Sequence, residues 1–339
     1  MIFFDVTEVS AWRHASGLAR VSRRLRAELG GAAVPSRWPA MRAAPGPADW
    51  LLTPELFSEA ERPGFTAFLE RRPCRLAAIY HDAIPIKHPA TTWPRSVERH
   101  PSYMKLLARF DRVWAVSAAS RDELLGFWRW QGIAEPPPVE VLALGADWDG
   151  LPREAAPAGG APGPSRIVSV GILEPRKNQA VLLDACGELR REGLEMELHL
   201  VGRVNPYFGR QIAARVAAMR AEWPGLRHHA RMDDAALAGL VRTARLTALA
   251  SVAEGCGLPL LESLWLGVPC ACSGIAPFLE SASAGGCEVV AANDVAGWKG
   301  ALRRMLTDGA HRARLAGEAR NRPLPTWAGA ARVLREALA

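Results

Sequence analysis

Short apolar runs alternate with longer amphipathic runs along most of the chain. In the second half, the apolar runs indicate buried strands and the runs between them indicate helices. Strands are predicted at residues 166–170, 196–201, 227–231, 246–250, 269–272 and 288–291. Helices are predicted at residues 179–191, 206–222, 234–243, 259–266 and 295–307. Because strands and helices alternate over short connections, we expect a parallel sheet with right-handed crossovers.

The first half shows the same alternation less regularly. We predict strands at residues 2–6, 50–53, 75–80, 112–116 and 139–142, and helices at 18–29, 97–109 and 120–130. Between the halves, eleven of the fifteen residues 151–165 are Pro, Gly or Ala and follow no period, which is typical of a linker.

The linker and the length of 339 residues both indicate two domains. The fold class is therefore α/β, with two Rossmann-like domains of parallel strands. Such sheets bind ligands at the carboxyl ends of their strands, so we expect an interdomain cleft to hold the site. The predicted parts are an N-terminal domain at 1–150, the linker at 151–165, a C-terminal domain at 166–322, and a final helix within 323–339 that crosses back to the N-terminal domain or caps its own.

Composition and charge limit the class of protein. Lys and Arg exceed Asp and Glu by seven, which favours an anionic partner such as a phosphorylated small molecule or a phospholipid. The basic residues are spread along the chain and the aromatic residues follow no nucleic-acid-binding pattern, so no nucleic acid partner is expected. The six Cys form no Cys-x-x-Cys pair, which indicates buried, reduced thiols and no zinc site.

The sequence also bears on location. We find no run of 18 apolar residues that could span a membrane. The apolar N-terminal stretch is cut short by Asp5 and lacks a basic region and a cleavage site, so it indicates a first strand and not a signal peptide. The expected location is the cytoplasm.

A basic pair stands between a predicted strand and a predicted helix. The strand ends at Gly171, the helix begins near Asn178, a good N-cap residue, and Arg176 and Lys177 lie in the loop between them. Two cations beside a helix N-terminus can hold a diphosphate. Solvated surface cations are the alternative. The position favours function, as does a Lys in a chain where only four of 42 basic residues are Lys.

Two carboxylates, Glu254 and Glu262, flank a Gly-x-Gly loop. Gly255 and Gly257 let backbone N–H groups approach a ligand closely, and Pro259 suits the first turn of a helix, which would place Glu262 in that turn. Each acid alone fits a structural role, such as complementing the helix dipole. Together they predict acceptors for the hydroxyl groups of a sugar or ribose. No third Gly stands at the spacing of a dinucleotide fingerprint.

These motifs resemble those of the family 4 (GT4) retaining glycosyltransferases, which have the GT-B fold. Residues 254–262 resemble the family's E-x7-E motif, and residues 171–178 resemble its phosphate loop. Residues 80–85 resemble the family's HD-x-x-P segment, residues 17–21 its N-terminal glycine loop, and residues 144–147 the G-x-D that closes its N-terminal domain. The resemblance covers nearly the whole chain in the right order.

The resemblance implies an activity. A hexose, mannose or a similar sugar, would pass from a nucleotide-diphosphate donor, with retention, to a glycan or lipid-linked oligosaccharide acceptor. The product would belong to a bacterial surface polysaccharide such as O-antigen or capsule. The nucleotide sugar is the substrate, and neither a cofactor nor a metal is expected. Peripheral contact with the inner face of the cytoplasmic membrane is an open option.

The resemblance also implies roles for single residues. Arg176 and Lys177 would hold the donor diphosphate and stabilise its charge during catalysis. Glu262 would accept from the ribose hydroxyls, Glu254 would contact the transferred sugar, and His81 would lie near the reacting centre. Further donor contacts are expected from Gly17, Gly255, Cys256, Gly257 and Leu258.

Two positions depart from the family pattern. Cys256 stands where members often carry an aromatic residue. Ile172 stands where many carry an Arg directly after the phosphate-loop Gly, so Arg176 is expected to substitute for that cation.

Some other polar residues have competing interpretations. His81 follows a predicted strand and is expected at the cleft edge, with a structural histidine as the alternative. Asp82 is expected to support the turn, and His228 and His229 to be structural. Three further histidines are assigned to loops without a role: His14, His88 and His100.

Asp147 and Asp149 form an Asp-x-Asp pair, which in another glycosyltransferase architecture binds a divalent metal with the nucleotide. Because the pair starts the linker, we expect a hinge and no metal. A basic run over the first loop and helix is interpreted either as a solvated face or as a contact for anionic lipid. The run consists of Arg13, Arg20, Arg23, Arg24 and Arg26.

Two other functions fit the same motifs. A GT-B-like nucleotide-sugar epimerase would share the phosphate loop but release a free epimer. A non-catalytic scaffold would bind nucleotide sugar without turnover, although both acids of the motif are intact.

Overall fold

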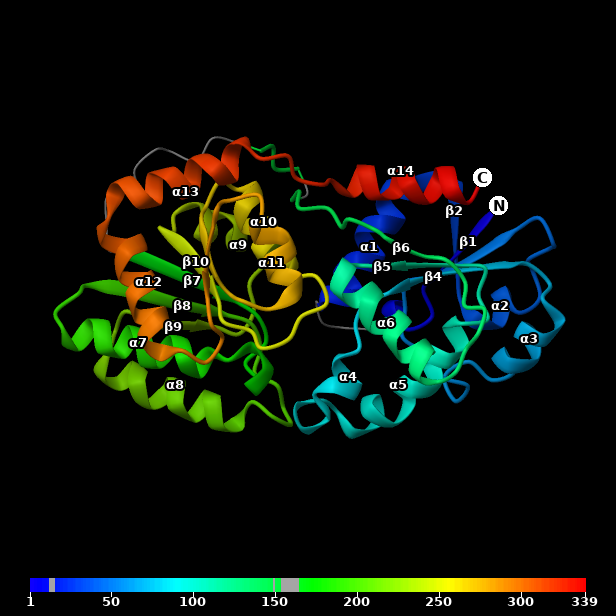
Figure 1. Ribbon diagram of the computed structural model, residues 1–339, viewed down its shortest axis with the longest axis horizontal. Coiled ribbons are helices and arrows are strands. Elements are labelled where there is room, and N and C mark those ends of the chain that lie inside the picture. Colours follow the sequence, from blue (N-terminus) through cyan, green and yellow to red (C-terminus); the bar gives the residue numbers. More distant parts are fainter. Residues whose placement is uncertain (12–15, 149, 154–164) are drawn as a thin grey trace. The chain divides into compact units, whose positions relative to one another are not determined.

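The computed structural model describes residues 1–11, 16–148, 150–153 and 165–339 (Figure 1). The chain forms two compact units: Met1–Gly145 with Pro325–Ala339 make unit 1, and Ala146–Leu324 make unit 2. Most of the predicted linker, residues 154–164, lies outside the described residues, as do Arg13, His14 and Asp149. Within the described part of the chain, no helix has the length and apolar character that a membrane span requires.

Unit 1 contains a six-stranded parallel sheet with the strand order β2-β1-β3-β4-β5-β6. All five predicted strands are present, and β2 was not predicted. The sequence of β2 holds Pro35 and has only one buried position, which an edge strand tolerates but which gives no apolar pattern to detect. The strands are β1 (Ile2–Asp5), β2 (Ala33–Ser36), β3 (Trp50–Thr53), β4 (Arg75–Tyr80), β5 (Arg112–Ala115) and β6 (Val139–Val141).

An aromatic-rich core covers one face of this sheet, built from residues of α2, α3, α5 and α6. His100 lies within α5 and is buried, so its assignment to a loop was wrong. The longer predicted helices are present. The helices of unit 1 are α1 (Gly17–Leu29), α2 (Trp38–Met41), α3 (Phe65–Arg71), α4 (Ile84–Lys87), α5 (Pro94–Leu107), α6 (Ala118–Trp130) and α14 (Trp327–Ala337).

The final helix, α14, belongs to unit 1 and packs along α1, as Figure 1 shows. The guanidinium of Arg24 on α1 lies 5.8 Å from the centre of the Trp327 ring on α14. Gly145 approaches the same tryptophan so closely that a Cβ atom would lie 2.3 Å from the Trp327 backbone nitrogen. The two segments that make up unit 1 therefore contact each other at Trp327.

Unit 2 contains a second six-stranded parallel sheet, with the order β12-β11-β10-β7-β8-β9. All six predicted strands are present, within a few residues at their ends. The strands are β7 (Ser165–Val170), β8 (Met196–Val201), β9 (Leu226–His229), β10 (Leu246–Leu249), β11 (Cys270–Ser273) and β12 (Cys287–Val290).

Helices cover both faces of the unit 2 sheet, with α7, α8 and α12 in the core of one face and α9, α10 and α11 against the other. Predicted and observed bounds agree for α7 and α12. Neither α11 nor α13 was predicted, because α11 is short and α13 buries only Leu315 and Ala319. The helices are α7 (Gln179–Arg191), α8 (Arg210–Glu222), α9 (Asp234–Arg242), α10 (Leu258–Trp265), α11 (Ala276–Ala282), α12 (Val295–Thr307) and α13 (Gly309–Asn321).

The strand order of unit 2 creates a switch point. From β7 the chain proceeds outward through β8 and β9, and then returns to place β10 on the other side of β7. The loops that follow β7 and β10 therefore leave the sheet edge in opposite directions. In open α/β sheets, ligands bind at the carboxyl ends of the strands beside such a point.

Candidate functional site

The loops after β7 and β10 meet at the switch point of unit 2. Pro175–Lys177 form a single 3-10 turn, and the carbonyl of Arg176 accepts a hydrogen bond from the backbone N–H of Val252 at 2.9 Å. This contact places Arg176 and Lys177 beside the loop that carries Glu254. The basic pair and the Gly-x-Gly loop, which are separate motifs in the sequence, therefore lie side by side in the fold.

Lys177 and Glu254 form an ion pair. The Nζ of Lys177 donates to Oε1 of Glu254 at 2.6 Å, and the Ser251 hydroxyl donates to the same oxygen at 2.6 Å. Ser273, at the end of β11, donates through its hydroxyl to the Ser251 carbonyl. Both side chains of the pair are mostly buried, with 14% of Lys177 and 12% of Glu254 exposed.

Arg176 is held by carboxylates on both sides. Its Nη1 donates to the Ala253 carbonyl at 2.8 Å and to Oε2 of Glu254 at 3.3 Å, and its Nη2 donates to Oε1 of Glu174 at 2.7 Å. Two cations and two carboxylates thus form a cluster without net formal charge. We call Glu174, Arg176, Lys177 and Glu254 the switch-point cluster.

The cluster changes the acidity of its members. Burial lowers the pKa of Lys177, and the neighbouring Glu254 opposes this effect. Burial alone would raise the pKa of Glu254, but the charges of Lys177 and Arg176 outweigh it and lower that pKa below its usual range. Glu254 is therefore a carboxylate at neutral pH.

The Gly-x-Gly loop leads directly into α10. Gly257 has a φ of +84°, and a Cβ atom there would lie 2.4 Å from Cε1 of Phe278. Leu258 is the first residue of α10 and Pro259 the second, which suits a residue without a backbone N–H. Burial raises the pKa of Cys256 to about 12, so its side chain is a neutral thiol.

Glu262 is the fifth residue of α10, so its predicted place in the first turn was wrong. The residue is 7% exposed, and its backbone carbonyl accepts a hydrogen bond from Nε1 of Trp148 at 3.3 Å. Trp148, between the two aspartates of the Asp-x-Asp pair, is buried in unit 2. The ribose contact of Glu262 stays a prediction.

Asn178 takes the N-cap position of α7, as predicted, but its side chain does not cap the helix. The residue adopts φ +52°, and its Nδ2 donates to the Ala292 carbonyl at 2.8 Å. The left-handed backbone of Asn178 therefore sets the start of α7, and the loop after β12 holds Asn178 in place.

Gly17 and His81 belong to unit 1. Gly17 opens α1 after the N-cap residue Ser16. His81 follows β4 and is 6% exposed, and its Nε2 lies 2.8 Å from the Pro54 carbonyl. Because a carbonyl only accepts, Nε2 carries the proton. Burial lowers the pKa of His81, so the ring is neutral at neutral pH, with Nδ1 as an acceptor. Its role at the reacting centre stays a prediction.

The structural roles predicted for other polar residues are confirmed. Oδ1 of Asp82 accepts from the Ile84 backbone N–H at 2.9 Å, which supports the turn after β4. His228 lies 2.8 Å from the Gly202 carbonyl, and His229 lies 3.0 Å from Nδ1 of His199. All six cysteines are free, four of them buried.

Several charged residues near strand ends were not predicted. Glu55, just after β3, accepts from the backbone N–H groups of Glu8 and Val9, both at 2.8 Å. Arg62 bridges Glu55 at 2.7 Å and Asp5 at 2.5 Å, and all three side chains are 1% exposed. An acid at the carboxyl end of a predicted strand was the available signal for Glu55. In unit 2, Glu174 after β7 was missed in the same way, and the uncharged Asn205 after β8 offered no such signal.

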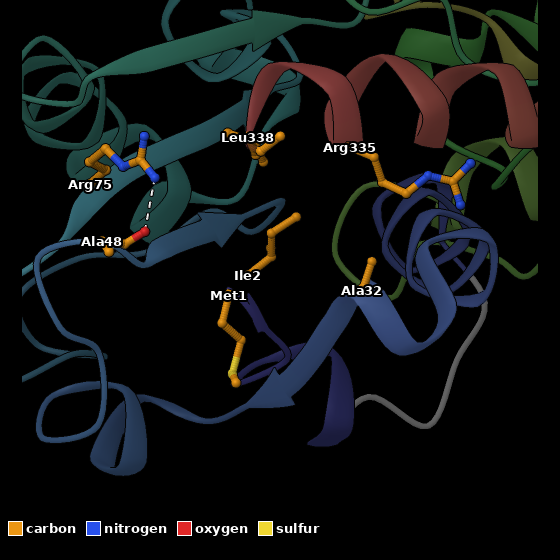
Figure 2. A pocket seen from close by; sticks show the side chains of 8 residues that line it. Met1, Ile2, Ala32, Ala48, Arg75, Arg335 and Leu338 are labelled. Atoms are coloured by element: carbon orange, nitrogen blue, oxygen red, sulfur yellow. Dashed lines mark hydrogen bonds between the residues drawn. The ribbon is translucent and has the colours of Figure 1, made fainter.

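Within the described parts of the chain, no group of three or more His, Cys, Asp or Glu side chains could hold a metal ion. Unit 1 contains a cavity of about 280 Å³, and Figure 2 shows residues that line it, among them Met1, Arg75 and Arg335. Met1 and Arg75 stand at the amino ends of β1 and β4, so this cavity lies away from the carboxyl ends where the predicted residues stand.

The basic run on α1 is only partly exposed. Arg23 and Arg26 are exposed on the helix, whereas Arg24 packs over Trp327. Arg24 therefore serves the packing of α1 on α14.

Residues 154–322, which cover nearly all of unit 2, match the family described as glycosyl transferases group 1. The chain is also similar to the serotype-specific mannosyltransferase WbdA of Escherichia coli, with 31% identity over 232 residues. That alignment covers 60% of this chain and 26% of WbdA, so the chain spans about a quarter of the length of this relative.

Solved structures share the fold over most of the chain. HepE of Anabaena, solved in complex with UDP and glucose, superposes with a TM-score of 0.70 at 15% identity, over 94% of this chain and 93% of HepE. Sucrose-phosphate synthase of Thermosynechococcus elongatus gives a TM-score of 0.66 at 18% identity, over 85% of this chain and 72% of that enzyme. The match therefore shows that residues 154–322 belong to the group 1 glycosyltransferases, and the two parallel α/β sheets, with the likeness to these solved structures, show the GT-B fold.

Proposed function

We propose that the protein is a retaining, GT4-type hexosyltransferase that takes mannose or a similar sugar from a nucleotide-diphosphate donor. The observation that carries this proposal is the switch-point cluster, which places Arg176 and Lys177 beside Glu254 at the carboxyl ends of β7 and β10. Two cations at this point suit a diphosphate, and a carboxylate beside them suits the hydroxyl groups of the attached sugar. The likeness to a mannosyltransferase supports mannose.

The proposed catalysis is electrostatic. As the glycosidic bond breaks, negative charge develops on the leaving diphosphate, and Arg176 and Lys177 stabilise it from fixed positions. Because these cations are already ordered by Glu174 and Glu254, little reorganisation accompanies the reaction.

Glu254 is a poor candidate for a covalent nucleophile. Its two oxygens already accept from Lys177, Ser251 and Arg176. We therefore favour attack of the acceptor on the same face as the leaving group, with the leaving phosphate oxygen taking the acceptor's proton. Glu254 would orient the transferred sugar.

A thermal-shift screen of GDP-mannose, UDP-glucose and dTDP-sugars identifies the donor, because a ligand that binds the folded state raises the melting temperature. We expect GDP-mannose to give the largest shift. Lys177→Ala is expected to abolish transfer from the selected donor and to leave the circular dichroism spectrum unchanged. Normal transfer by the folded variant would refute the proposal.

The matched control is Lys299→Ala. Lys299 also pairs with glutamates in unit 2, at 2.8 Å from Glu188 and 3.3 Å from Glu192, but it lies on α12 away from the strand ends. Its loss should leave transfer unchanged. The anomeric configuration of the product, read by NMR, tests retention.

We propose that no metal is required, and activity in EDTA tests this. Complete loss, restored by manganese, would favour a metal-dependent mechanism instead. Product analysis separates the alternatives: an epimerase would release a free epimeric nucleotide sugar without acceptor, and a scaffold would bind donor without turnover.

We further propose a glycan or lipid-linked acceptor from the assembly of a bacterial surface polysaccharide such as O-antigen, at the cytoplasmic side of the membrane. The relative WbdA is named a serotype-specific mannosyltransferase, which supports a role in surface polysaccharide assembly. The exposed Arg23 and Arg26 on α1 would contact anionic lipid. Sedimentation with phosphatidylglycerol vesicles should be lost in an Arg23→Glu, Arg26→Glu double variant, and equal sedimentation of both proteins would refute the contact.

A further inference from the structure

Glu174 is bonded on both of its oxygens. Its Oε1 accepts from Nη2 of Arg176 at 2.7 Å, and its Oε2 accepts from Nδ2 of Asn205 at 2.7 Å. Glu174 is 7% exposed and Asn205 is 3% exposed. A buried carboxylate is stable only when it is paired and hydrogen-bonded, and these two partners meet that requirement.

The orientation of the Asn205 amide is fixed by its own loop. Its Oδ1 accepts from the backbone N–H groups of Tyr207 at 2.9 Å and Phe208 at 3.1 Å. A flipped amide would bring two donors against each other, so Nδ2 is forced toward Glu174. The backbone of Asn205 is anchored as well, since its N–H donates to the Leu173 carbonyl at 3.0 Å and its carbonyl accepts from Gly209.

We propose that Glu174 and Asn205 are positioning residues that hold the Arg176 guanidinium toward the donor diphosphate. The inference rests on the proposed function, because it takes Arg176 as a donor contact. A long arginine side chain loses conformational entropy when it is ordered. A chain of hydrogen bonds, from the backbone of residues 207 and 208 through Asn205 and Glu174, orders the Arg176 side chain before the donor binds.

This chain of hydrogen bonds needs a hydrogen-bond donor at position 205 and a side chain at position 174 that accepts two hydrogen bonds. Glu174→Gln leaves one acceptor oxygen for two donors, so Arg176 loses the partner of its Nη2 and keeps only the contacts of its Nη1. We expect kcat for GDP release from GDP-mannose to fall about 10- to 100-fold with a smaller change in KM, since correct placement matters most in the transition state.

Asn205→Asp gives a signature that a merely structural role would not produce. The new carboxylate can still accept from Tyr207 and Phe208, but it faces Glu174 and must share a proton with it. The ionisable groups beside this pair include Arg176, Lys177 and Tyr207, and Glu254 lies beyond the two cations. We expect kcat of this variant to approach the wild-type value near pH 6 and to fall at least about 10-fold by pH 8.5.

The experiment compares wild type, both variants, Arg176→Ala and the control Glu197→Gln. Glu197 is also paired with an arginine, Arg166 at 3.0 Å, but stands near the amino end of β8, away from the carboxyl ends of the strands. If Arg176→Ala loses turnover while Glu174→Gln and Asn205→Asp keep wild-type kcat at every pH, the inference is overturned and the proposed function stands. If Arg176→Ala itself keeps wild-type turnover, the proposed role of the cluster in donor binding fails.

Discussion

Lys177 donates to Glu254 at 2.6 Å across 77 positions of sequence. The two residues follow neighbouring parallel strands, β7 and β10, at the point where the strand order of unit 2 reverses. A carboxylate thus pairs with a cation that is proposed to bind the donor diphosphate.

The first prediction concerns Glu254→Gln. Removing one carboxylate gives the switch-point cluster a net positive charge, so affinity for GDP should rise about 3- to 10-fold, which is about 1 kcal/mol. Transfer should fall at least about 100-fold because the contact to the sugar is lost. Titration calorimetry with GDP and initial rates measure the two effects. Weaker GDP binding with normal transfer would contradict the role assigned to Glu254.

The second prediction concerns Gly257→Ala. A left-handed backbone and a Cβ atom 2.4 Å from Phe278 both penalise a side chain at this position. The free energy of unfolding should fall by about 2–4 kcal/mol. The control is Gly239→Ala in α9, where an added Cβ meets nothing within 4 Å and should stabilise the helix by up to about 1 kcal/mol. Calorimetric scans measure both, and equal melting temperatures would contradict the argument.

The third prediction concerns the pH dependence of stability. Burial and the charge of Asp5 raise the pKa of Glu55 from 4.5 to about 7, against the opposing effect of its backbone donors and Arg62. The folded state therefore binds this proton more tightly than the unfolded state. The resulting stability is fully present below pH 4.5 and is lost as the pH rises through about 7.

Comparison with Glu55→Gln isolates this effect. The difference in unfolding free energy, wild type minus variant, should fall by at most about 3 kcal/mol between pH 4.5 and pH 7.5. Glu59→Gln should give the opposite sign at lower pH. Burial raises the pKa of Glu59, but hydrogen bonds from Thr66 and Gly64 outweigh it and lower that pKa below 4.5, so the resulting stability is present above pH 4.5 and is lost as the pH falls below it. Urea unfolding at several pH values measures both differences. A flat difference for Glu55 would rule out its titration in this range.

The fourth prediction concerns Arg153→Ala. The Nη2 of Arg153 donates to the carbonyls of Ala319 at 2.7 Å and Arg322 at 2.6 Å, at the end of α13. Charged donors at the end of a helix stabilise its carbonyls, so unit 2 should lose about 1–3 kcal/mol. Arg314→Ala, which removes an exposed pair within α13, should cost at most about 0.5 kcal/mol. Similar losses for both would show that the contacts of Arg153 add nothing.

Much of the fold could be predicted because each buried strand is a short apolar run that ends at a turn signal. Predicted bounds match the observed ones for β3, β4, β8, α7 and α12. The elements that escaped are those with little buried apolar surface, such as β2 and α13. Their position depends on tertiary contacts that a local pattern does not contain.

The candidate site divides in the same way. Arg176, Lys177 and Glu254 could be selected because each stands in a loop between a predicted strand and a predicted helix, where α/β sheets bind ligands. Their partners could not. That Glu174 joins Arg176 to Asn205 depends on how β7 and β8 are aligned, and 31 positions of sequence separate Glu174 from Asn205. Buried ion pairs such as Arg62 with Asp5 resemble surface charges until the fold is known.

The last helix of unit 1 has a consequence for synthesis. Because α14 follows all of unit 2 in the sequence, unit 2 can emerge from the ribosome complete while α1 still lacks the helix that packs on it. Until then, the face of α1 around Arg24 and Glu28, which contacts Trp327 and Arg335 of α14 in the folded unit, is open to chaperones or to misassociation. Unit 1 therefore becomes complete only after unit 2, although most of unit 1 precedes unit 2 in the sequence.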